Sequence, residues 1–429
     1  FARYSTDTEW LAPHFEKMLY DNALLLSVLS EAYQSTKKLR YREVIEETMV
    51  FVQRELLHPD GAFYSALDAD TEGEEGKFYV WDNDEVLKIL GGDAALFCEY
   101  YDITPSGNWE GKNILRVKES IEQLAGKKNI SVDELKKVLI ISKEKMLFQR
   151  SKRKRPLLDD KIILGWNALM NIACSKTYAA TGNSIYKELA IKNIKFLLAK
   201  FKGEGKAFYH TWKNDEGKYP AFLDDCAFLI EALIYLNEIT SETEWLLKAE
   251  ELTTFVLENF NEEETSFFFF THRDQKDVII RKKEVYDGAI PSGNSVMGYN
   301  LLHLSILLDN PIWRKRSYNM ISALSKAISK YPTSFGIWIS LFQELIYGTD
   351  EIAIVGENFN GLLEEVISAY IPHKVLMASP NPNTDQKFPL LAGKPVNDLT
   401  FIYLCKKFSC LKPVISVQEL LYLKSLENV

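Results

Sequence analysis

The sequence predicts a helix-dominated chain, an (α/α)6 toroid of six helical hairpins with a small β-α-β element appended near the C-terminus. Acidic residues recur at regular intervals before apolar segments with helical spacing, and more polar helical segments alternate with them. After residue 350 short β-branched runs replace the helical period. We therefore expect a barrel over residues 1–350, and an appended α/β element with a C-terminal helix over residues 351–429.

The acidic repeat sets the expected hairpins. Its members lie about 63 residues apart, with one longer interval, and an inner helix, a turn, an outer helix and a loop fill such a period. The longer interval is expected to hold an inserted loop and a short helix around 106–128. The six acids are Asp21, Asp84, Asp160, Asp224, Asp287 and Asp350.

The segments around these acids support the repeat. Short aromatic runs occur at 62–64, 207–209 and 267–270, and each of them follows a polar turn. Asn310 followed by Pro311 is typical of a helix start. Outer helices are expected over 41–57, 183–201 and 242–260.

The C-terminal segment has a different pattern. Residues 351–355 and 374–377 are predicted strands, and the helix predicted over 361–370 lies between them. This order indicates a β-α-β unit. It lacks the glycine pattern of a dinucleotide site.

Composition narrows the classes of function. The 429-residue chain has a net charge of −9, which disfavours nucleic-acid binding. It has no long uncharged apolar stretch, so we expect no membrane span. Five sparse cysteines, including Cys405 and Cys410, indicate reduced thiols and a cytoplasmic protein. No residue set has metal-ligand spacing, and we expect neither metal nor cofactor. The chain begins at Phe1 rather than Met, so we expect that an upstream segment has been removed.

The richest polar segment lies at the N-terminus. We expect His14 and Lys17 to share a helix face near the first acid. His14 is a candidate acid or base, and the neighbouring groups are candidates for holding a substrate. The alternative is a hydrogen-bonding cluster that fixes the first hairpin. The proposed binding residues here are Arg3, Tyr4, Glu16, Lys17, Tyr20, Asp21 and Asn22.

Two pairs of adjacent carboxylates precede later helices. The first pair is Asp159 and Asp160, which stands before Trp166 and Asn167. The second pair is Asp224 and Asp225. One acid of each pair is expected to cap its helix. The other is expected to face a cavity, where burial and its neighbour raise its pKa. Capping alone remains the alternative for both pairs.

Further candidates lie in loops and turns. Asp287, Ser292 and Asn294 belong to a turn-rich helix start, which is expected either to bind sugar hydroxyls or simply to cap the helix. His210 follows an aromatic run and is a candidate second base. Asp70 lies in an acidic loop that lacks the last ligand of a calcium loop and is expected to reach over the cavity.

These motifs together resemble a known family. They are residues 3–7, 13–22, 160–161, 166–167, 224–225 and 291–295. The chain resembles the thioredoxin-domain-containing family of bacterial YyaL-like proteins and the animal spermatogenesis-associated homologue. The resemblance implies a thioredoxin-like domain upstream of Phe1. It also implies a six-hairpin glycosidase-like barrel similar to N-acylglucosamine and cellobiose 2-epimerases, with the site in a central funnel.

Two functions remain open from the sequence. The first is a carbohydrate-active enzyme with an acidic, aromatic-lined cavity. As an epimerase or isomerase it would use His14 and His210, and as a glycoside hydrolase Asp160, Asp225 and Asp287. The second is a non-catalytic ligand-binding or quality-control module that works with the thioredoxin-like domain.

Overall fold

The computed structural model spans the 429-residue chain and describes all of it except 204–206, 276, 383–386, 396–398 and 428–429. It divides into two compact units. Unit 1 comprises Phe1–Met18 and Ala66–Asp160, and unit 2 comprises Leu19–Ser65 and Lys161–Val429. The sequence did not predict a separate unit 1, and the boundary expected at 350/351 stays a prediction.

Unit 1 combines helices with short strands. The helices bury apolar side chains such as Trp81, Phe97 and Leu139 against one another. The longer interval of the acidic repeat lies in unit 1 and contains α5. Ser120 and Gln123 form a capping box at the start of this helix. The elements are α3 (Asn83–Leu90), α4 (Ala94–Tyr100), α5 (Ile121–Lys128), α6 (Val132–Ser151), β1 (Lys17–Met18), β2 (Ala66–Leu67), β3 (Asp70–Thr71), β4 (Glu74–Glu75) and β5 (Leu158–Asp159).

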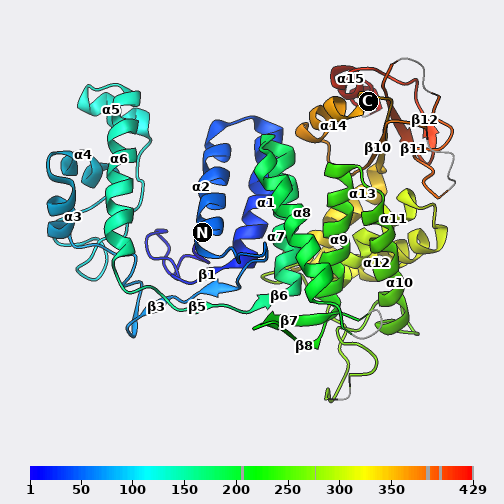
Figure 1. The fold of residues 1–429 in the computed structure, drawn as a ribbon, viewed down its shortest axis with the longest axis horizontal. Helices are drawn as coiled ribbons and strands as arrows, with labels where there is room; N and C mark the ends of the chain where they lie inside the picture. Colours follow the sequence, from blue (N-terminus) through cyan, green and yellow to red (C-terminus); the bar gives the residue numbers. More distant parts are fainter. Residues whose placement is uncertain (204–206, 276, 383–386, 396–398, 428–429) are drawn as a thin grey trace. The chain divides into compact units, whose positions relative to one another are not determined.

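Unit 2 contains the helical hairpins (Figure 1). The inner helices α1, α7, α9, α11 and α13 pack in that order, and each of the first four contacts the helix that follows it in the chain. These pairs are α1 (Leu19–Thr36) with α2 (Leu39–Glu55), α7 (Leu164–Thr181) with α8 (Ser184–Lys200), α9 (Leu223–Thr240) with α10 (Glu244–Asn259), and α11 (Gly293–Leu307) with α12 (Pro311–Lys330); α13 spans Gly336–Tyr347.

The burial of these helices follows their sequences. Helices α7, α9 and α11 are apolar nearly all round and are almost wholly buried, whereas α2 and α12 bury only one face. Asn310 caps α12 with Pro311 at its first position, as predicted. The predicted fold class, a helix-dominated chain of (α/α)6 hairpin type with a small β-α-β element, is confirmed.

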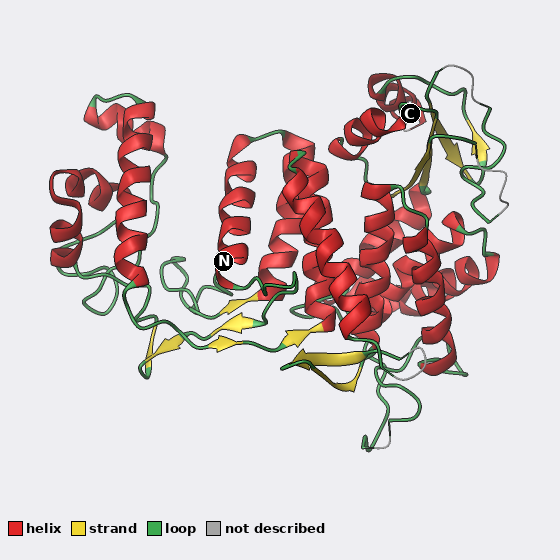
Figure 2. Cartoon of the chain, viewed as in Figure 1, coloured by secondary structure: helices red, strands yellow, loops and turns green. Residues whose placement is uncertain are grey.

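Short strands precede the inner helices (Figure 2). In unit 2, β6 (Ile162–Ile163) runs directly into α7 and pairs with β7 (Tyr209–Lys213). Strand β7 pairs in turn with β8 (Glu216–Pro220). This three-stranded sheet brings a strand that precedes α9 beside the start of α7.

The C-terminal element is a four-stranded sheet in the order β10-β9-β11-β12. Strands β9 (Asp350–Val355) and β10 (Lys374–Ser379) are parallel, and α14 (Phe359–Ser368) connects them, which confirms the β-α-β prediction. The remaining elements are β11 (Phe401–Lys406), β12 (Ser409–Cys410) and α15 (Val417–Glu427).

Asp350 corrects the last step of the acidic repeat. It begins the buried strand β9, not a helix, because the β-branched residues that follow it form a fully buried strand. Its carboxylate is paired with Lys424 and Lys406. Five of the six acids therefore precede or begin helices, and the sixth does not.

The cysteines also differ from the prediction of reduced thiols. Cys405 and Cys410 are direct partners across the antiparallel β11–β12 pair and form a disulfide. Cys98, Cys174 and Cys226 are free. The hairpin register brings the C-x4-C pair together, and the sequence spacing alone did not reveal that register.

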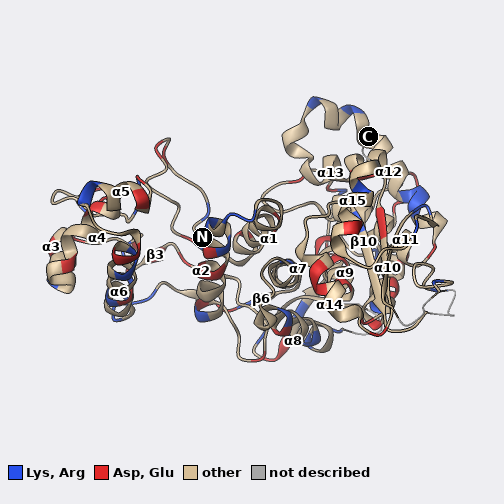
Figure 3. Ribbon diagram, turned by 90° about the horizontal axis from the view of Figure 1, so that it is seen from above, with Lys and Arg blue, Asp and Glu red and all other residues tan. Residues whose placement is uncertain are grey.

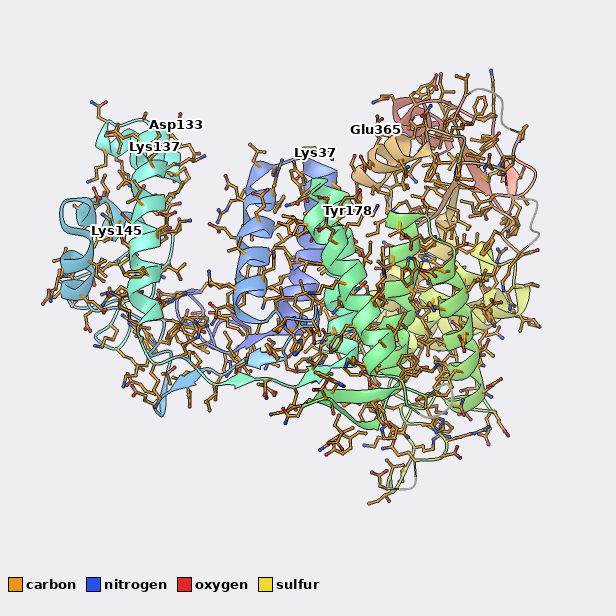
Figure 4. The ribbon with its side chains drawn as sticks, viewed as in Figure 1. Lys37, Asp133, Lys137, Lys145, Tyr178 and Glu365 are labelled. Atoms are coloured by element: carbon orange, nitrogen blue, oxygen red, sulfur yellow. A yellow bond between two sulfur atoms is a disulfide. The ribbon has the colours of Figure 1, made fainter. Side chains whose placement is uncertain are left out.

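Two side chains tie the helical hairpins to α14 (Figure 4). Tyr178 of α7 donates a hydrogen bond to Glu364, and the Lys37 ammonium donates one to the carbonyl of Ser368.

Within the described part of the chain, no helix combines the length and apolar character needed to cross a lipid bilayer.

Candidate functional site

The predicted carboxylates of α9 lie in its first turn, and acidic residues continue along this helix (Figure 3). Asp225 is almost fully buried and accepts three hydrogen bonds. Its Oδ1 accepts from Gly165 N at 2.8 Å, and its Oδ2 accepts from Phe222 N at 2.9 Å. The same Oδ2 lies 2.7 Å from Nδ1 of His210. Asp225 thus caps the neighbouring helix α7 and orients a histidine.

Asp224 has a different environment. Its Oδ1 accepts one hydrogen bond, from Gly293 N at the start of α11, at 2.8 Å. Burial first, and then the charge of Asp225, raise the pKa of Asp224 to about 7, although the Gly293 hydrogen bond opposes them. This carboxyl group therefore exchanges a proton near neutral pH.

His210 reaches this pair from β7, and its side chain is 27% exposed. Burial lowers its pKa, but the hydrogen bond and charge of Asp225 and the charge of Asp224 outweigh burial and raise it. Its Nε2 makes no hydrogen bond with the residues that the structure describes. A histidine fixed through Nδ1 with a free Nε2 is a suitable acid or base.

Two glycines allow the carboxylates to approach the helix starts. A Cβ atom at Gly165 would lie 2.9 Å from Oδ1 of Asp225, and one at Gly293 would lie 2.4 Å from Oδ1 of Asp224. Any larger residue would push the carboxylates away. These glycines belong to the site, and the sequence analysis missed them as such.

The turn before α11 holds two predicted residues, Asp287 and Ser292. Asp287 accepts from Ser292 N at 3.0 Å, from Ser295 Oγ at 2.7 Å and from Ile337 N, in the first turn of α13, at 2.9 Å. The Ser292 side chain caps α11. Asp287 is therefore connected to Asp224 through the start of α11, and both its oxygens are engaged.

Two predicted asparagines clamp the loops that follow the outer helices. Asn167 accepts from Phe63 N at 2.7 Å and donates to Phe63 O at 2.9 Å. Asn294 does the same with Phe268, at 2.8 and 3.0 Å. Both phenylalanines belong to the predicted aromatic runs. The repeat therefore encodes a structural amide clamp at these positions.

The first inner helix holds three more predicted residues. Tyr20 is buried, and its ring packs edge-on against Trp166 with the centroids 4.9 Å apart. Asp21 and the fully buried Asn22 lie in the first turn of α1. All three therefore lie at the start of an inner helix, like Asp224 and Asp225.

The other predicted residues lie in unit 1. His14 stacks on Tyr4 with ring centroids 5.2 Å apart, and Arg3 lies 3.6 Å from Glu16. The buried Nδ1 of His14 has no hydrogen-bond partner among the described residues. Asp70 begins strand β3 of a two-stranded hairpin, and Asp160 ends the unit.

Lys17 departs from its predicted place. It lies in β1, not on a helix face with His14, because its backbone pairs with Leu67 before α1 begins at Leu19. Its Nζ lies 4.0 Å from the Tyr79 ring centroid. Burial, and then the charge of Arg150, lower the pKa of Lys17 to about 7.

The structure adds residues that the sequence did not single out. The ring centroid of Phe222 lies 4.9 Å from that of His210, and Phe222 stacks on Phe270 with centroids 4.8 Å apart. Aromatic rings therefore lie on one side of the cluster formed by His210, Asp225 and Asp224. Glu284 adds negative charge that raises the pKa of Asp224. The aromatic run around Phe270 could have indicated this contact from the sequence, whereas no sequence pattern singled out Glu284.

The fold is that of a helical-hairpin protein in which His210, Asp225 and Asp224 lie together at the start of α9. No family model matches the chain. The chain is 31% identical over 460 residues to an uncharacterised protein of Caenorhabditis elegans, covering 98% of this chain and 62% of that protein. It is 29% identical to spermatogenesis-associated protein 20 of Homo sapiens, covering 98% and 59%. The predicted similarity to spermatogenesis-associated proteins is confirmed.

The chain spans about three-fifths of the length of these curated relatives. Among solved structures it is similar to cellobiose 2-epimerase from Spirochaeta thermophila, with a TM-score of 0.48 and 13% identity, covering 78% of this chain and 65% of that chain. A likeness at this level carries no argument about the reaction.

Proposed function

We propose that His210, Asp225 and Asp224 form the acid–base site of a carbohydrate-active enzyme of the epimerase or isomerase type. The observation that carries the proposal is the arrangement of His210. Asp225 holds its Nδ1 at 2.7 Å, its Nε2 is free of partners among the described residues, and Asp224 with a pKa of about 7 lies beside it. The arrangement brings an imidazole whose pKa is raised beside a carboxyl group whose pKa is about 7.

Such a pair suits proton transfer beside a sugar carbonyl. One group removes the proton from the carbon next to the carbonyl while the other returns a proton to it, and the two exchange roles in the reverse direction. Asp225 positions the imidazole and does not itself react. Phe222 and Phe270 offer aromatic faces to the apolar side of a sugar ring.

The hydrolase alternative is less well supported. It needs two free carboxyl groups on either side of the scissile bond. Asp225 and Asp287, its two candidates in unit 2, have both oxygens engaged, chiefly by backbone N–H groups. Carboxylates held in this way are helix caps, which supports the epimerase or isomerase reaction.

The second proposed function is a non-catalytic module that binds a small ligand and works with a thioredoxin-like domain upstream. The capping role of Asp224, Asp225 and Asp287 favours it, because capping alone accounts for their hydrogen bonds. A cytoplasmic location, and partners limited to small molecules and that domain, are part of both proposals.

Proton NMR in deuterium oxide tests the enzyme proposal. The chain is incubated with a panel of reducing mono- and disaccharides, and deuterium incorporation beside the carbonyl is followed. We expect exchange and epimer formation with at least one sugar. His210→Gln and Asp224→Asn should each lower the rate by roughly 100-fold or more. Glu216→Gln, on the exposed strand β8, is the matched control and should keep the native rate.

The binding-module alternative makes the opposite prediction. A sugar that binds without any deuterium exchange would contradict the enzyme proposal and support the alternative. Exchange that persists unchanged in both His210→Gln and Asp224→Asn would assign the reaction to another site.

A further inference from the structure

A cavity of about 450 Å³ lies between the inner helices of unit 2. Its wall comprises residues of α1, α7, α9, α11 and α13, together with 369–376, which lead into β10. Ligand pockets usually measure roughly 300–1,000 Å³, so this one has room for a molecule of monosaccharide or disaccharide size. None of the residues predicted to be catalytic lines it.

In the wall of this cavity, ion pairs join side chains from different helices and strands. Their charges come mainly from the C-terminal halves of the inner helices, opposite to the ends that hold Asp224 and His210. A paired buried charge is far less costly than a single one. The pairs are Lys176–Glu31 at 2.6 Å, Lys374–Glu238 at 2.7 Å, His303–Glu344 at 2.9 Å and His373–Glu344 at 3.5 Å.

Glu231 is the exception. It lines the cavity from α9, and it makes no hydrogen bond or ion pair with any residue that the structure describes. Lys176 and His303 act on it only through longer-range charge, and burial raises its pKa. Glu231 is half-buried, and a carboxyl group partly removed from water without a partner carries a desolvation cost that the surrounding protein does not offset.

Two further groups on the same wall lack partners. Asn237 is 2% exposed and Ser175 is fully buried. The Asn237 Oδ1 and Ser175 Oγ atoms have no hydrogen-bond partner among the described residues, and both residues line the cavity. Native proteins rarely leave such atoms unsatisfied. A bound molecule in the cavity would supply the missing partners.

We propose that this cavity is a second binding site, separate from the acid–base cluster, for a small hydroxyl-rich molecule with one amino group, such as an amino sugar or amino alcohol. The unmatched atoms are chiefly acceptors, so the ligand must bring hydrogen-bond donors. These ion pairs leave Glu231 as the unmatched acid among the described residues of the lining, which suits a single ammonium group. The ring of Tyr299 also lines the cavity and offers a face to that cation, whereas the Tyr235 ring already has the Lys176 ammonium 4.9 Å from its centroid.

Isothermal titration calorimetry of the 429-residue chain tests this proposal with three probes of similar size. These are D-glucosamine, D-glucose and D-glucuronate. We expect glucosamine to bind at least about tenfold more tightly than glucose, and glucuronate not to bind, because hydrogen bonds to charged groups are the strong ones. Glu231→Gln keeps the shape of the side chain and should remove the preference for glucosamine.

Two further variants locate the binding. Ala179→Phe, on the α7 wall, should fill the cavity and abolish binding while circular dichroism shows a folded chain. Glu216→Gln, on the exposed strand β8 and outside both the cavity and the acid–base cluster, should leave the glucosamine affinity unchanged. The proposal fails if no probe binds at millimolar concentration. It also fails if glucose binds as tightly as glucosamine, or if Glu231→Gln retains the native affinity and preference.

Discussion

The two ends of the inner helices treat carboxylates in opposite ways. At the N-terminal ends, Asp225 and Asp287 accept hydrogen bonds chiefly from backbone N–H groups, and both cap neighbouring helices. In the cavity, Glu31 and Glu238 instead pair with lysines from other elements, and Glu231 pairs with nothing among the described residues.

This difference indicates what each end of the inner helices contributes to the protein. A helix N-terminus carries partial positive charge and free N–H groups, so a carboxylate there stabilises the fold without a cation. Ion pairs in a cavity leave polar atoms accessible to a ligand. We therefore expect substitutions at the N-terminal ends to affect stability strongly, and substitutions of Glu231 to affect binding far more than stability.

Asp225→Asn should have the largest effect on stability. The carboxylate accepts three hydrogen bonds, and an amide in its place directs NH2 donors at backbone N–H groups or at His210. We expect a loss of roughly 3–5 kcal/mol in the free energy of unfolding. Chemical denaturation followed by far-ultraviolet circular dichroism measures it. A loss below about 1 kcal/mol would show that the cap is dispensable.

Asp224→Asn should change the pH dependence of stability. The folded pKa of about 7 exceeds the unfolded value of 3.8, so the native state holds the extra proton between these values. The stability of the native chain therefore falls as pH rises from about 4 through 7, by up to about 4 kcal/mol. The variant should lack this fall and be more stable at pH 8. Parallel pH slopes for the two proteins would contradict the raised pKa.

Gly293→Ala and Gly336→Ala form a matched pair, because each glycine begins an inner helix. A Cβ at Gly293 would lie 2.4 Å from Oδ1 of Asp224, and the carboxylate must move. We expect a loss of about 1–3 kcal/mol there. At Gly336 no atom lies within 4 Å, and alanine should be neutral or stabilising by up to about 1 kcal/mol. Equal thermal midpoints for the two variants would show that Asp224 does not contact the backbone so closely.

Glu231→Gln should have the smallest effect on stability. The side chain has no partner to lose among the described residues, so we expect a change within about 1 kcal/mol at pH 6. Its pKa is raised, so its ionisation destabilises the native chain as pH rises through that value. The variant should therefore gain stability relative to the native chain as pH rises. A large loss at all pH values would show that Glu231 is a structural residue, not a ligand group.

Much of the fold followed from local pattern. The apolar segments of α7, α9 and α11 identified the inner helices, and Asn310 with Pro311 marked the start of α12. The same local logic failed at Asp350, where an acid begins a strand, and at Lys17, which lies in β1. At Asp350 the acid does not reveal whether the apolar run after it is a helix or a strand, and at Lys17 the backbone pairs with Leu67, which lies far along the chain.

The acid–base cluster was only partly predictable. Asp224 and Asp225 were marked by their position at a helix start, and His210 by the aromatic run before it. Sequence could not show that β7 turns Nδ1 of His210 toward Asp225, or that Phe222 and Phe270 lie beside it. These contacts depend on the pairing of β6 with β7, which no local pattern specifies.

By itself, the sequence determined the helices, their inner or outer place and the acids that begin them, because helical periodicity and capping act between residues a few positions apart. Only the tertiary structure decided which side chains meet. Lys176 reaches Glu31, and Lys374 reaches Glu238, across long stretches of chain. Glu231 is left without a partner among the described residues, because only the packing of five inner helices decides which charges face one cavity.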